Sequence, residues 1–271
     1  MKNFAIYDEQ LERKDPIGYL FYYEKSESFI IELCSSLNEW EVPLLFQGLV
    51  KKGIYTIPKD ISFMWVQERI IPSGRQNIGE ILKNHKLKEY SEIALLTLSK
   101  GRSAQDDCYL KVISEEEVPE AIKKRSFGNV VECFTTENSG VVCLFGDNTA
   151  RIVFLEKLMD KYKDVGHILR RRELFESVQV GVGGYSIIFN EAIEIAASDL
   201  RKVGELLPLS TNDFFRFVQK NVVDTTTACM MIECSRQNLS YLVKENKLNP
   251  ILHGTKENLY TKGELTRIKN D

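Results

Sequence analysis

The sequence predicts an α+β, multidomain chain: two small α+β domains followed by a C-terminal pair of short helices joined by a tight turn. Three observations carry this. A length of 271 residues is long for a single hydrophobic core. Strand-like apolar runs punctuated by turn residues fill the first two thirds of the chain. The last third instead spaces its apolar residues as in amphipathic helices.

The composition places the chain among ordinary cytoplasmic proteins. It holds 43% hydrophobic and 28% charged residues, and no apolar run reaches the roughly 18–20 residues that a membrane helix needs. The N-terminus turns polar at once, unlike a signal peptide. The net charge of −3 does not attract nucleic acid to the whole molecule, so a DNA-binding surface has to be local.

The six cysteines and three histidines do not predict a metal site or a cofactor. No Cys-x-x-Cys pair occurs, and no cysteine stands near a histidine at zinc-ligand spacing. We expect half-buried, reduced thiols and no bound metal or cofactor.

The first predicted domain covers residues 1–113. Residues 18–24 and 29–35 read as two strands joined by a polar turn, and the apolar run 61–71 reads as a third strand ending at Pro72. A helix over 75–87, a helix ending at Gly101 and a strand over 108–113 follow. Residues 114–129 are charged and contain Pro119, which predicts a linker or a short exposed helix.

The second predicted domain covers residues 129–205, and the third covers 209–271. Strands separated by turns at 138–140 and 146–148 begin the second domain, and two more strands flank the turn at Gly183-Gly184. The third domain starts with a capped helix over 210–222, whose apolar side chains should anchor it: Phe214, Phe215, Phe217 and Val218.

Two similar stretches, identical at six of 13 positions, raise the question of function: RQNIGEILKNHKL at 75–87 and RQNLSYLVKENKL at 236–248. The first follows a strand that ends in Pro-Ser-Gly, so we interpret its polar residues as an ordinary helix start. The second follows a short helix at 225–232 and a tight turn at 233–235, with Ser235 as an N-cap. Leu239, Leu242 and Val243 face inward at helical spacing. This order predicts a helix-turn-helix, with a wing at 250–260.

In such a unit the second helix enters the major groove of DNA. Arginine suits guanine or phosphate, and glutamine suits adenine. Lys256 and Asn258 in the wing are expected to hold phosphate. The predicted DNA-binding residues are Thr226, Ser235, Arg236, Gln237, Asn238, Ser240, Tyr241, Lys244, Lys256 and Asn258.

The C-terminal 50 residues resemble the winged helix-turn-helix of the MerR and excisionase-like families. The matching pieces are Ala228, Ser235-Arg236, Leu239, Leu242, Lys247-Leu248-Asn249-Pro250 and Lys256 to Tyr260. The sequence departs from the family pattern in two ways. Glu233 stands where glycine is usual, and residues 221–271 hold seven Lys or Arg against six Asp or Glu, a net charge of +1.

The other regions also resemble known families. Residues 129–205 are similar to the bacterial domain-of-unknown-function family 2442, through Val130-Val131, Leu144 to Asp147, Leu174-Phe175 and Gly184-Tyr185. That resemblance implies a small α+β unit without enzymatic activity. The first domain looks like the N-terminal subdomain of HipA-type proteins, through Gly18-Tyr19-Leu20, Pro43-Leu44, Ile71 to Gly74, Leu95-Leu96 and Gly101-Arg102.

No stretch predicts a catalytic centre, so we expect the protein not to be an enzyme. Cys108 follows Asp106-Asp107 and Arg102, and a cysteine nucleophile needs a base beside it, whereas the nearest histidine in sequence is His85. The Asp-Asp pair reads as a solvated turn. Residues 181–186 lack the spacing of a phosphate-binding loop, and the arginine run 170–172 reads as a solvated face.

The function expected from the sequence is a bacterial or phage transcriptional regulator, a repressor or autoregulator, that binds double-stranded operator DNA as a homodimer. The alternative is a protein-interaction module, such as an antitoxin-like or anti-defence adaptor. It would bind a protein partner through its N-terminal or middle domain and use the helix pair for autoregulation, packing or dimerisation. The acidic net charge favours the alternative, and the order helix, turn, helix, wing favours the regulator.

Overall fold

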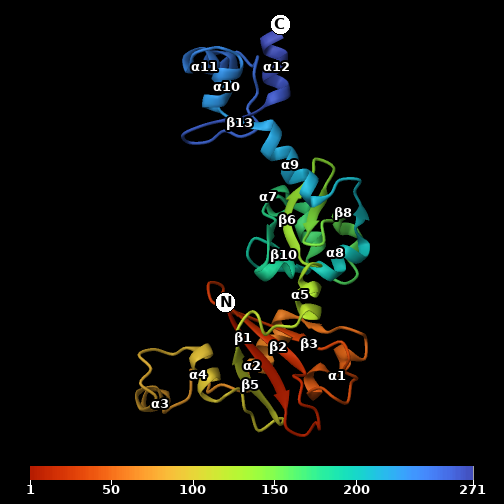
Figure 1. Ribbon diagram of the computed structural model, residues 1–271, viewed down its shortest axis with the longest axis vertical. Coiled ribbons are helices and arrows are strands. Elements are labelled where there is room, and N and C mark those ends of the chain that lie inside the picture. Colours follow the sequence, from red (N-terminus) through yellow and green to blue (C-terminus); the bar gives the residue numbers. More distant parts are fainter. Residues whose placement is uncertain (271) are drawn as a thin grey trace. The chain divides into compact units, whose positions relative to one another are not determined.

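The computed structural model describes residues 1–270 and confirms the α+β class, with 36% helix and 23% antiparallel strand (Figure 1). Its contacts divide the chain into two compact units. The first comprises 1–130 and 178–198, and the second comprises 131–177 and 199–271. This division differs from the predicted domains at 1–113, 129–205 and 209–271, because residues 114–130 and 178–198 make their contacts with the N-terminal region.

The first unit is built on a five-stranded antiparallel sheet with the order β4-β3-β2-β1-β5. Its strands are β1 (Lys2–Asp8), β2 (Gly18–Tyr23), β3 (Ser28–Leu33), β4 (Thr56–Ile57) and β5 (Cys108–Ile113). The two strands expected near 18–24 and 29–35 and the one at 108–113 are confirmed. Strand β1, which no expectation included, lies in the sheet between β2 and β5.

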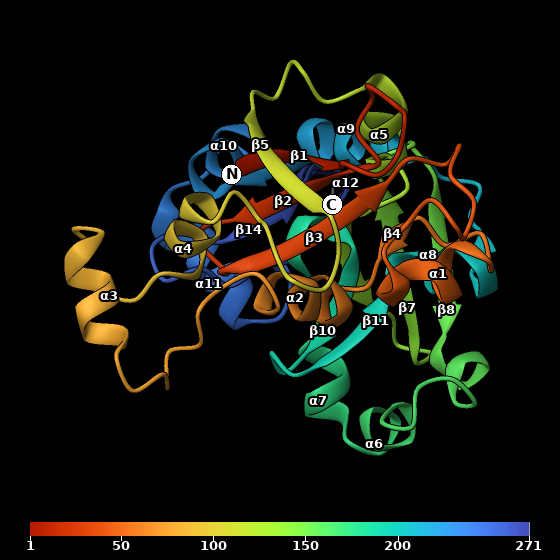
Figure 2. The same ribbon diagram turned by 90° about the horizontal axis from the view of Figure 1, so that it is seen from below.

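Helices cover both faces of this sheet, so β2 and β3 are buried along nearly their whole length. On one face, α1 (Leu44–Val50), α2 (Lys59–Gln67) and α4 (Glu92–Leu98) pack into the main core around Leu20, Phe29 and Ile31. On the other face lies α5 (Glu120–Ser126). Figure 2 shows α5 and α2 on opposite sides of strands β1–β3. A further helix, α3 (Ile78–Asn84), buries no side chain.

One expectation for this unit was wrong and another was partly right. Residues 61–71 do not form a strand: helix α2 occupies 59–67, because the apolar residues of this run, interrupted by Ser62 and by Gln67 to Arg69, fit helical spacing as well as alternation. Trp65 and Val66 are buried there, one turn after the buried Ser62. Of the two alternatives expected for residues 114–129, the short helix is present as α5, but the segment is not a linker. Val118 and Ile122 pack against the sheet, and the guanidinium of Arg125 donates to the buried carboxylate of Glu32.

The segment 178–198 contributes β9 (Gln179–Val180), β10 (Ser186–Phe189) and β11 (Ile193–Ala196), which form an antiparallel three-stranded sheet in the order β11-β10-β9. Three contacts join it to the rest of the first unit. Lys59 donates to Glu194 at 2.9 Å, the side chain of Asn129 donates to the carbonyl of Gly183 at 2.9 Å, and Tyr185 hydrogen-bonds Glu32.

Strand β5 lies at an edge of the five-stranded sheet, and its outward amides are partly occupied. The backbone N–H of Leu110 donates to the carbonyl of Lys100 at 2.7 Å. The backbone N–H of Cys108 donates to the Asp106 carboxylate at 3.1 Å. Because these backbone N–H groups already have acceptors, they are not available to pair with a further strand.

The second unit contains a four-stranded sheet with the order β12-β8-β7-β6. Its elements are β6 (Val130–Thr135), β7 (Gly140–Phe145), β8 (Ala150–Phe154), the 3-10 turn η1 (Leu155–Leu158), α6 (Val165–Arg170), α7 (Arg172–Glu176), α8 (Ala197–Val203) and β12 (Glu205–Leu206). The expected turns at 138–140 and 146–148 are confirmed.

Helix α9 (Thr211–Asn221) begins at the predicted cap, where Ser210 accepts a hydrogen bond from the N–H of Asp213 at 3.1 Å. Of its four expected anchors, Phe214 packs on the sheet and stacks on Phe134 with 5.8 Å between ring centroids. The other three keep much of their surface exposed: Phe215, Phe217 and Val218. No helix among residues 1–270 has the length and apolarity that a transmembrane span requires.

Candidate nucleic-acid interface

The C-terminal part of the second unit is a small scaffold around two short helices. Strand β13 (Val222–Asp224) pairs antiparallel with β14 (Leu259–Thr261), and between them lie α10 (Thr225–Met231) and α11 (Arg236–Lys244). Helix α12 (Lys262–Asn270) follows β14. Six buried side chains form one core: Val223, Ala228, Leu239, Leu248, Tyr260 and Leu265. The two expected helices are therefore present and share this core.

Both helices carry the caps that fix where they begin. Asp224 accepts from the N–H of Thr227 at 2.7 Å at the start of α10, and Ser235 accepts from the N–H of Asn238 at 3.2 Å at the start of α11. The hydrogen bonds to Asp224 lower the pKa of its carboxyl group. Ser235 and Asn238 are thus engaged in the helix cap.

The turn between the helices places Glu233 in the left-handed region, with φ of +54°. Glycine adopts this conformation more easily, which gives a physical reason for the glycine that the resemblance led us to expect. The carboxylate of Glu233 lies 2.5 Å from the ammonium of Lys269 in α12. This neighbour lowers the pKa of Glu233. Its negative charge is therefore balanced within the fold.

One face of α11 is exposed along its whole length. Leu239 is buried and Leu242 and Val243 are half-buried on the inner face, as the spacing predicts. The outer face presents Gln237, Ser240, Tyr241 and Lys244. Within residues 1–270, these four side chains make no hydrogen bond or ion pair with the rest of the fold, and Tyr241 is 54% exposed. Their donors and acceptors are free to meet another molecule.

Arg236 is also exposed, but its guanidinium is held by the protein itself. Nη2 donates to the hydroxyl of Thr226 at 2.6 Å and lies 3.6 Å from the Glu257 carboxylate. Helix α11 is in this way joined to the start of α10 and to the loop before β14. Sequence reasoning missed Glu257, and its place directly after Lys256 gave no signal that it would face Arg236.

The predicted wing is the segment between α11 and β14. Leu252 and Leu259 form a bridge, with hydrogen bonds from the N–H of Ile251 to Leu259 and from the N–H of Leu259 to Leu252, at 2.9 and 3.0 Å. Lys256 is exposed on the intervening loop. Asn258 is half-buried: its side chain donates to the Tyr260 hydroxyl, and its backbone exchanges hydrogen bonds with Thr225. Of the two predicted wing residues, Lys256 is therefore exposed and Asn258 is engaged within the fold.

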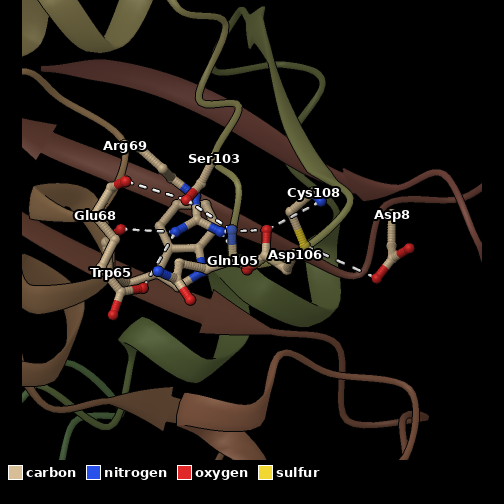
Figure 3. Close-up of polar contacts among 8 residues, drawn as sticks. All are labelled: Asp8, Trp65, Glu68, Arg69, Ser103, Gln105, Asp106 and Cys108. Atoms are coloured by element: carbon tan, nitrogen blue, oxygen red, sulfur yellow. Dashed lines mark hydrogen bonds and ion pairs between the residues drawn. The ribbon is translucent and has the colours of Figure 1, made fainter.

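A different cluster surrounds Cys108, the cysteine that the sequence had raised as a nucleophile (Figure 3). Arg69 is fully buried, stacks on Trp65 at 3.5 Å from the ring centroid and donates to both carboxylate oxygens of Asp106. Asp106 in turn accepts from the N–H of Cys108. The Asp106-Asp107 pair is therefore not simply a solvated turn, because Asp106 neutralises a buried cation.

The environment of Cys108 keeps its thiol protonated. Burial and the carboxylates of Asp106 and Asp8 raise its pKa far above the usual range. The Sγ atom lies 3.9 Å from Asp8, where it can only donate a weak hydrogen bond. A protonated, buried thiol is a poor nucleophile. The geometry therefore gives this cluster a structural role, the fixing of the loop before β5.

Among residues 1–270, no three His, Cys, Asp or Glu side chains are grouped so that they could hold a metal ion. Comparison with known proteins found no matching family model, no matching curated protein and no matching solved structure.

Proposed function

We propose that this protein is a sequence-specific DNA-binding regulator whose helix α11 reads the major groove. The observation that carries the proposal is the exposed face of α11, where Gln237, Ser240, Tyr241 and Lys244 are free of partners in the fold while the opposite face is fixed in a core. A rigid helix with free polar side chains is the form in which small DNA-binding domains meet base edges.

The cationic side chains around α11 are few, and they support a small number of contacts with DNA phosphates. Lys244 and Lys256 are exposed, and Arg236 becomes available if it exchanges Glu257 for a phosphate. One helix of this length reads only a few base pairs, so useful specificity requires two copies on two half-sites. The protein would then act as a homodimeric repressor or autoregulator on double-stranded DNA.

The test is a gel-shift assay of the whole protein on DNA from around its own gene, over a series of salt concentrations. Binding should weaken steeply as salt rises, because phosphate contacts release counterions. The variant Arg236→Ala/Gln237→Ala should lose specific binding. The matched control is Arg75→Ala/Gln76→Ala, which removes the same two side chains from the near-copy at 75–87. Equal loss in both variants, or no binding at low salt, would reject the proposal.

A second candidate is a protein-interaction module of the antitoxin-like or adaptor kind. The exposed apolar side chains of α9 and the acidic net charge of −3 favour it. Binding to a protein through apolar surface need not fall steeply with salt. The salt series therefore separates the two candidates.

A further inference from the structure

The turn between α10 and α11 brings two cysteines together, and the proposed DNA-binding role uses neither of them. Cys229 belongs to the last turn of α10, and Cys234 stands one residue before the Ser235 cap of α11. Both thiols are free and half-buried, and both pack against the core of the helix pair. Two reduced thiols on one small core are therefore candidates to react with each other.

The backbone of the turn explains why these two side chains meet. Ile232 caps the end of α10, and the next residue, Glu233, adopts a left-handed conformation. The N–H of Cys234 then donates back to the carbonyl of Cys229 at 3.1 Å. This is the hydrogen bond of a Schellman motif, which brings the side chains of the two residues that it joins into contact. In this chain both positions are cysteine.

The hydrogen bond also brings the two residues close enough for a covalent bond. Because it joins their backbones directly, their Cα atoms stay within the roughly 7 Å that a disulfide allows. The Sγ atom of Cys234 lies 3.4 Å from the carbonyl oxygen of Ser235, a weak contact that a disulfide would give up. The turn can therefore hold a disulfide without a change of fold.

The two thiols also influence each other electrostatically. Burial, together with the charge of the Cys229 thiol and a hydrogen bond to it, raises the pKa of Cys234. The thiolate is the reacting form of a cysteine. The reaction of this pair with an oxidant should therefore become faster as the pH rises toward the pKa of Cys234.

A second pair of cysteines occupies a different setting and supplies a control. Cys133 and Cys143 belong to the neighbouring strands β6 and β7 and are 8% and 0% exposed. Burial raises the pKa of Cys133 to about 12 and raises that of Cys143 as well. Thiols that are buried and protonated react slowly. Only the pair in the turn combines contact with access from solvent.

We propose that Cys229 and Cys234 are a redox modification site, which a low-molecular-weight disulfide such as oxidised glutathione closes to an intramolecular disulfide. The thiolate of one cysteine attacks a glutathione sulfur, whose S–S bond breaks and releases one glutathione thiolate. The thiolate of the other cysteine then attacks the mixed disulfide and releases the second. The protein loses two protons and two electrons, and oxidised glutathione becomes two reduced molecules.

The new bond spans the turn that positions α11. The assignment goes beyond the proposed function and does not depend on DNA binding, because the contacts that carry it lie within the helix pair and its core.

Trypsin allows both cysteine pairs to be measured in one digest of the whole protein. Cleavage yields one peptide, 221–236, that holds the proposed pair, and another, 126–151, that holds the buried pair. The folded protein is equilibrated in buffers with a graded ratio of oxidised to reduced glutathione. The reaction is stopped with acid, and the remaining thiols are alkylated in denaturant before digestion and mass spectrometry. Glutathione is preferred to a peroxide, because a peroxide would also oxidise the exposed Met230.

With oxidised glutathione in excess, the peptide 221–236 should lose two hydrogens and carry no alkyl group, whereas 126–151 should be alkylated at both cysteines. The proposal is overturned if 221–236 keeps both thiols at every ratio, or carries glutathione adducts without closing. Closure of the two peptides at the same ratio would also overturn it, since the turn would then have no special role.

Variants locate the reaction in the turn. In Cys229→Ser, Cys234 has no partner and should stop at the glutathione adduct. Glu233→Gly favours the left-handed conformation and Glu233→Val disfavours it, while both remove the ion pair with Lys269. Glu233→Gly should close as the wild type does, and Glu233→Val should need at least about tenfold more oxidised glutathione. Equal closure in the two folded variants would refute the role of the turn.

Discussion

Helices α3 and α11 come from similar sequences, yet the protein holds them in different ways. Helix α3 begins only at Ile78, three residues after its Arg75, has no side-chain cap and contains no fully buried side chain. Helix α11 begins at Arg236 itself, under the Ser235 cap, and buries Leu239 to 1% exposure. The residues before the shared stretch differ, Pro-Ser-Gly in one case and Glu-Cys-Ser in the other.

The comparison teaches that the shared Arg-Gln-Asn triplet does not decide the role of a helix. A cap and a core for the apolar residues decide where the helix starts and how firmly it is held. Only α11 has both, and only its polar face is presented from a rigid base. Equivalent positions in the two helices allow each of these differences to be tested with a matched pair of variants.

The largest difference is expected for the inward apolar residue. Leu239→Ala should destabilise the C-terminal core by about 2–5 kcal/mol, because a fully buried leucine leaves a cavity. The equivalent Ile78→Ala should cost less than about 1 kcal/mol, since Ile78 is only half-buried. Hydrogen-exchange mass spectrometry of peptides covering 225–248 and 75–87 would measure both. Similar loss of protection in the two helices would contradict the comparison.

The next effect concerns the polar face. Under the proposed function, Gln237→Ala should weaken binding to the specific DNA site by about 1–3 kcal/mol, the range for a good bidentate base contact. Gln76→Ala should leave it unchanged. Quantitative gel shifts at one fixed salt concentration would give both values. A wild-type affinity in Gln237→Ala would remove this residue from base recognition.

A smaller effect is expected at the caps. Ser235→Ala should reduce the stability of α11 by about 1 kcal/mol, because the N–H of Asn238 loses its acceptor. Asn77→Ala should have almost no effect, since the Asn77 side chain caps nothing in α3. Urea denaturation followed by circular dichroism would compare them. The expectation fails if Asn77→Ala costs as much as Ser235→Ala.

The smallest effect is expected from the ion pair of Arg236. Within residues 1–270, Arg236 has a carboxylate neighbour, Glu257, whereas Arg75 has none. Glu257→Gln should strengthen DNA binding about two- to fivefold, as the exposed ion pair contributes less than about 1 kcal/mol. The salt dependence of binding should steepen, because one more cation is free for phosphate. Unchanged affinity would show that Glu257 does not compete with DNA for Arg236.

Much of this fold follows from local sequence. The strands at 18–23, 28–33 and 108–113, the caps at Ser210 and Ser235 and the inward residues of α11 all obey spacing and capping rules. Helix α2 was not predicted, because the apolar residues of 61–71 fit the periods of a strand and of a helix alike, and only the surrounding core selects one of them. Strand β1 was not among the expected elements, because its apolar run, Phe4 to Tyr7, is short and is not followed directly by glycine or proline.

The position of the candidate site could be predicted from the sequence, but the ion pairs of its charged residues could not. The exposed face of α11 follows from helical geometry alone. The pairing of Arg236 with Glu257, and of Glu233 with Lys269, joins residues 21 and 36 positions apart in the sequence. Such contacts depend on how the wing and α12 return to the helix pair, and a single sequence does not encode them in any local pattern. The same holds for Arg69 and Asp106, which are 37 positions apart.

The carboxylate of Asp106 makes two separate interactions, and both bear on how much soluble protein can be produced. Its carboxylate neutralises buried Arg69 and also occupies the outward N–H of Cys108 on the edge strand β5. Loss of that carboxylate would leave buried Arg69 with only the more distant Glu68 carboxylate, at 3.8 Å, and would free the outward N–H of the edge strand in the same event. Substitutions at this residue should therefore appear first as inclusion bodies or intermolecular β-sheet, rather than as a soluble protein with altered binding. For this reason, the yield of soluble protein should fall markedly when Asp106 is substituted.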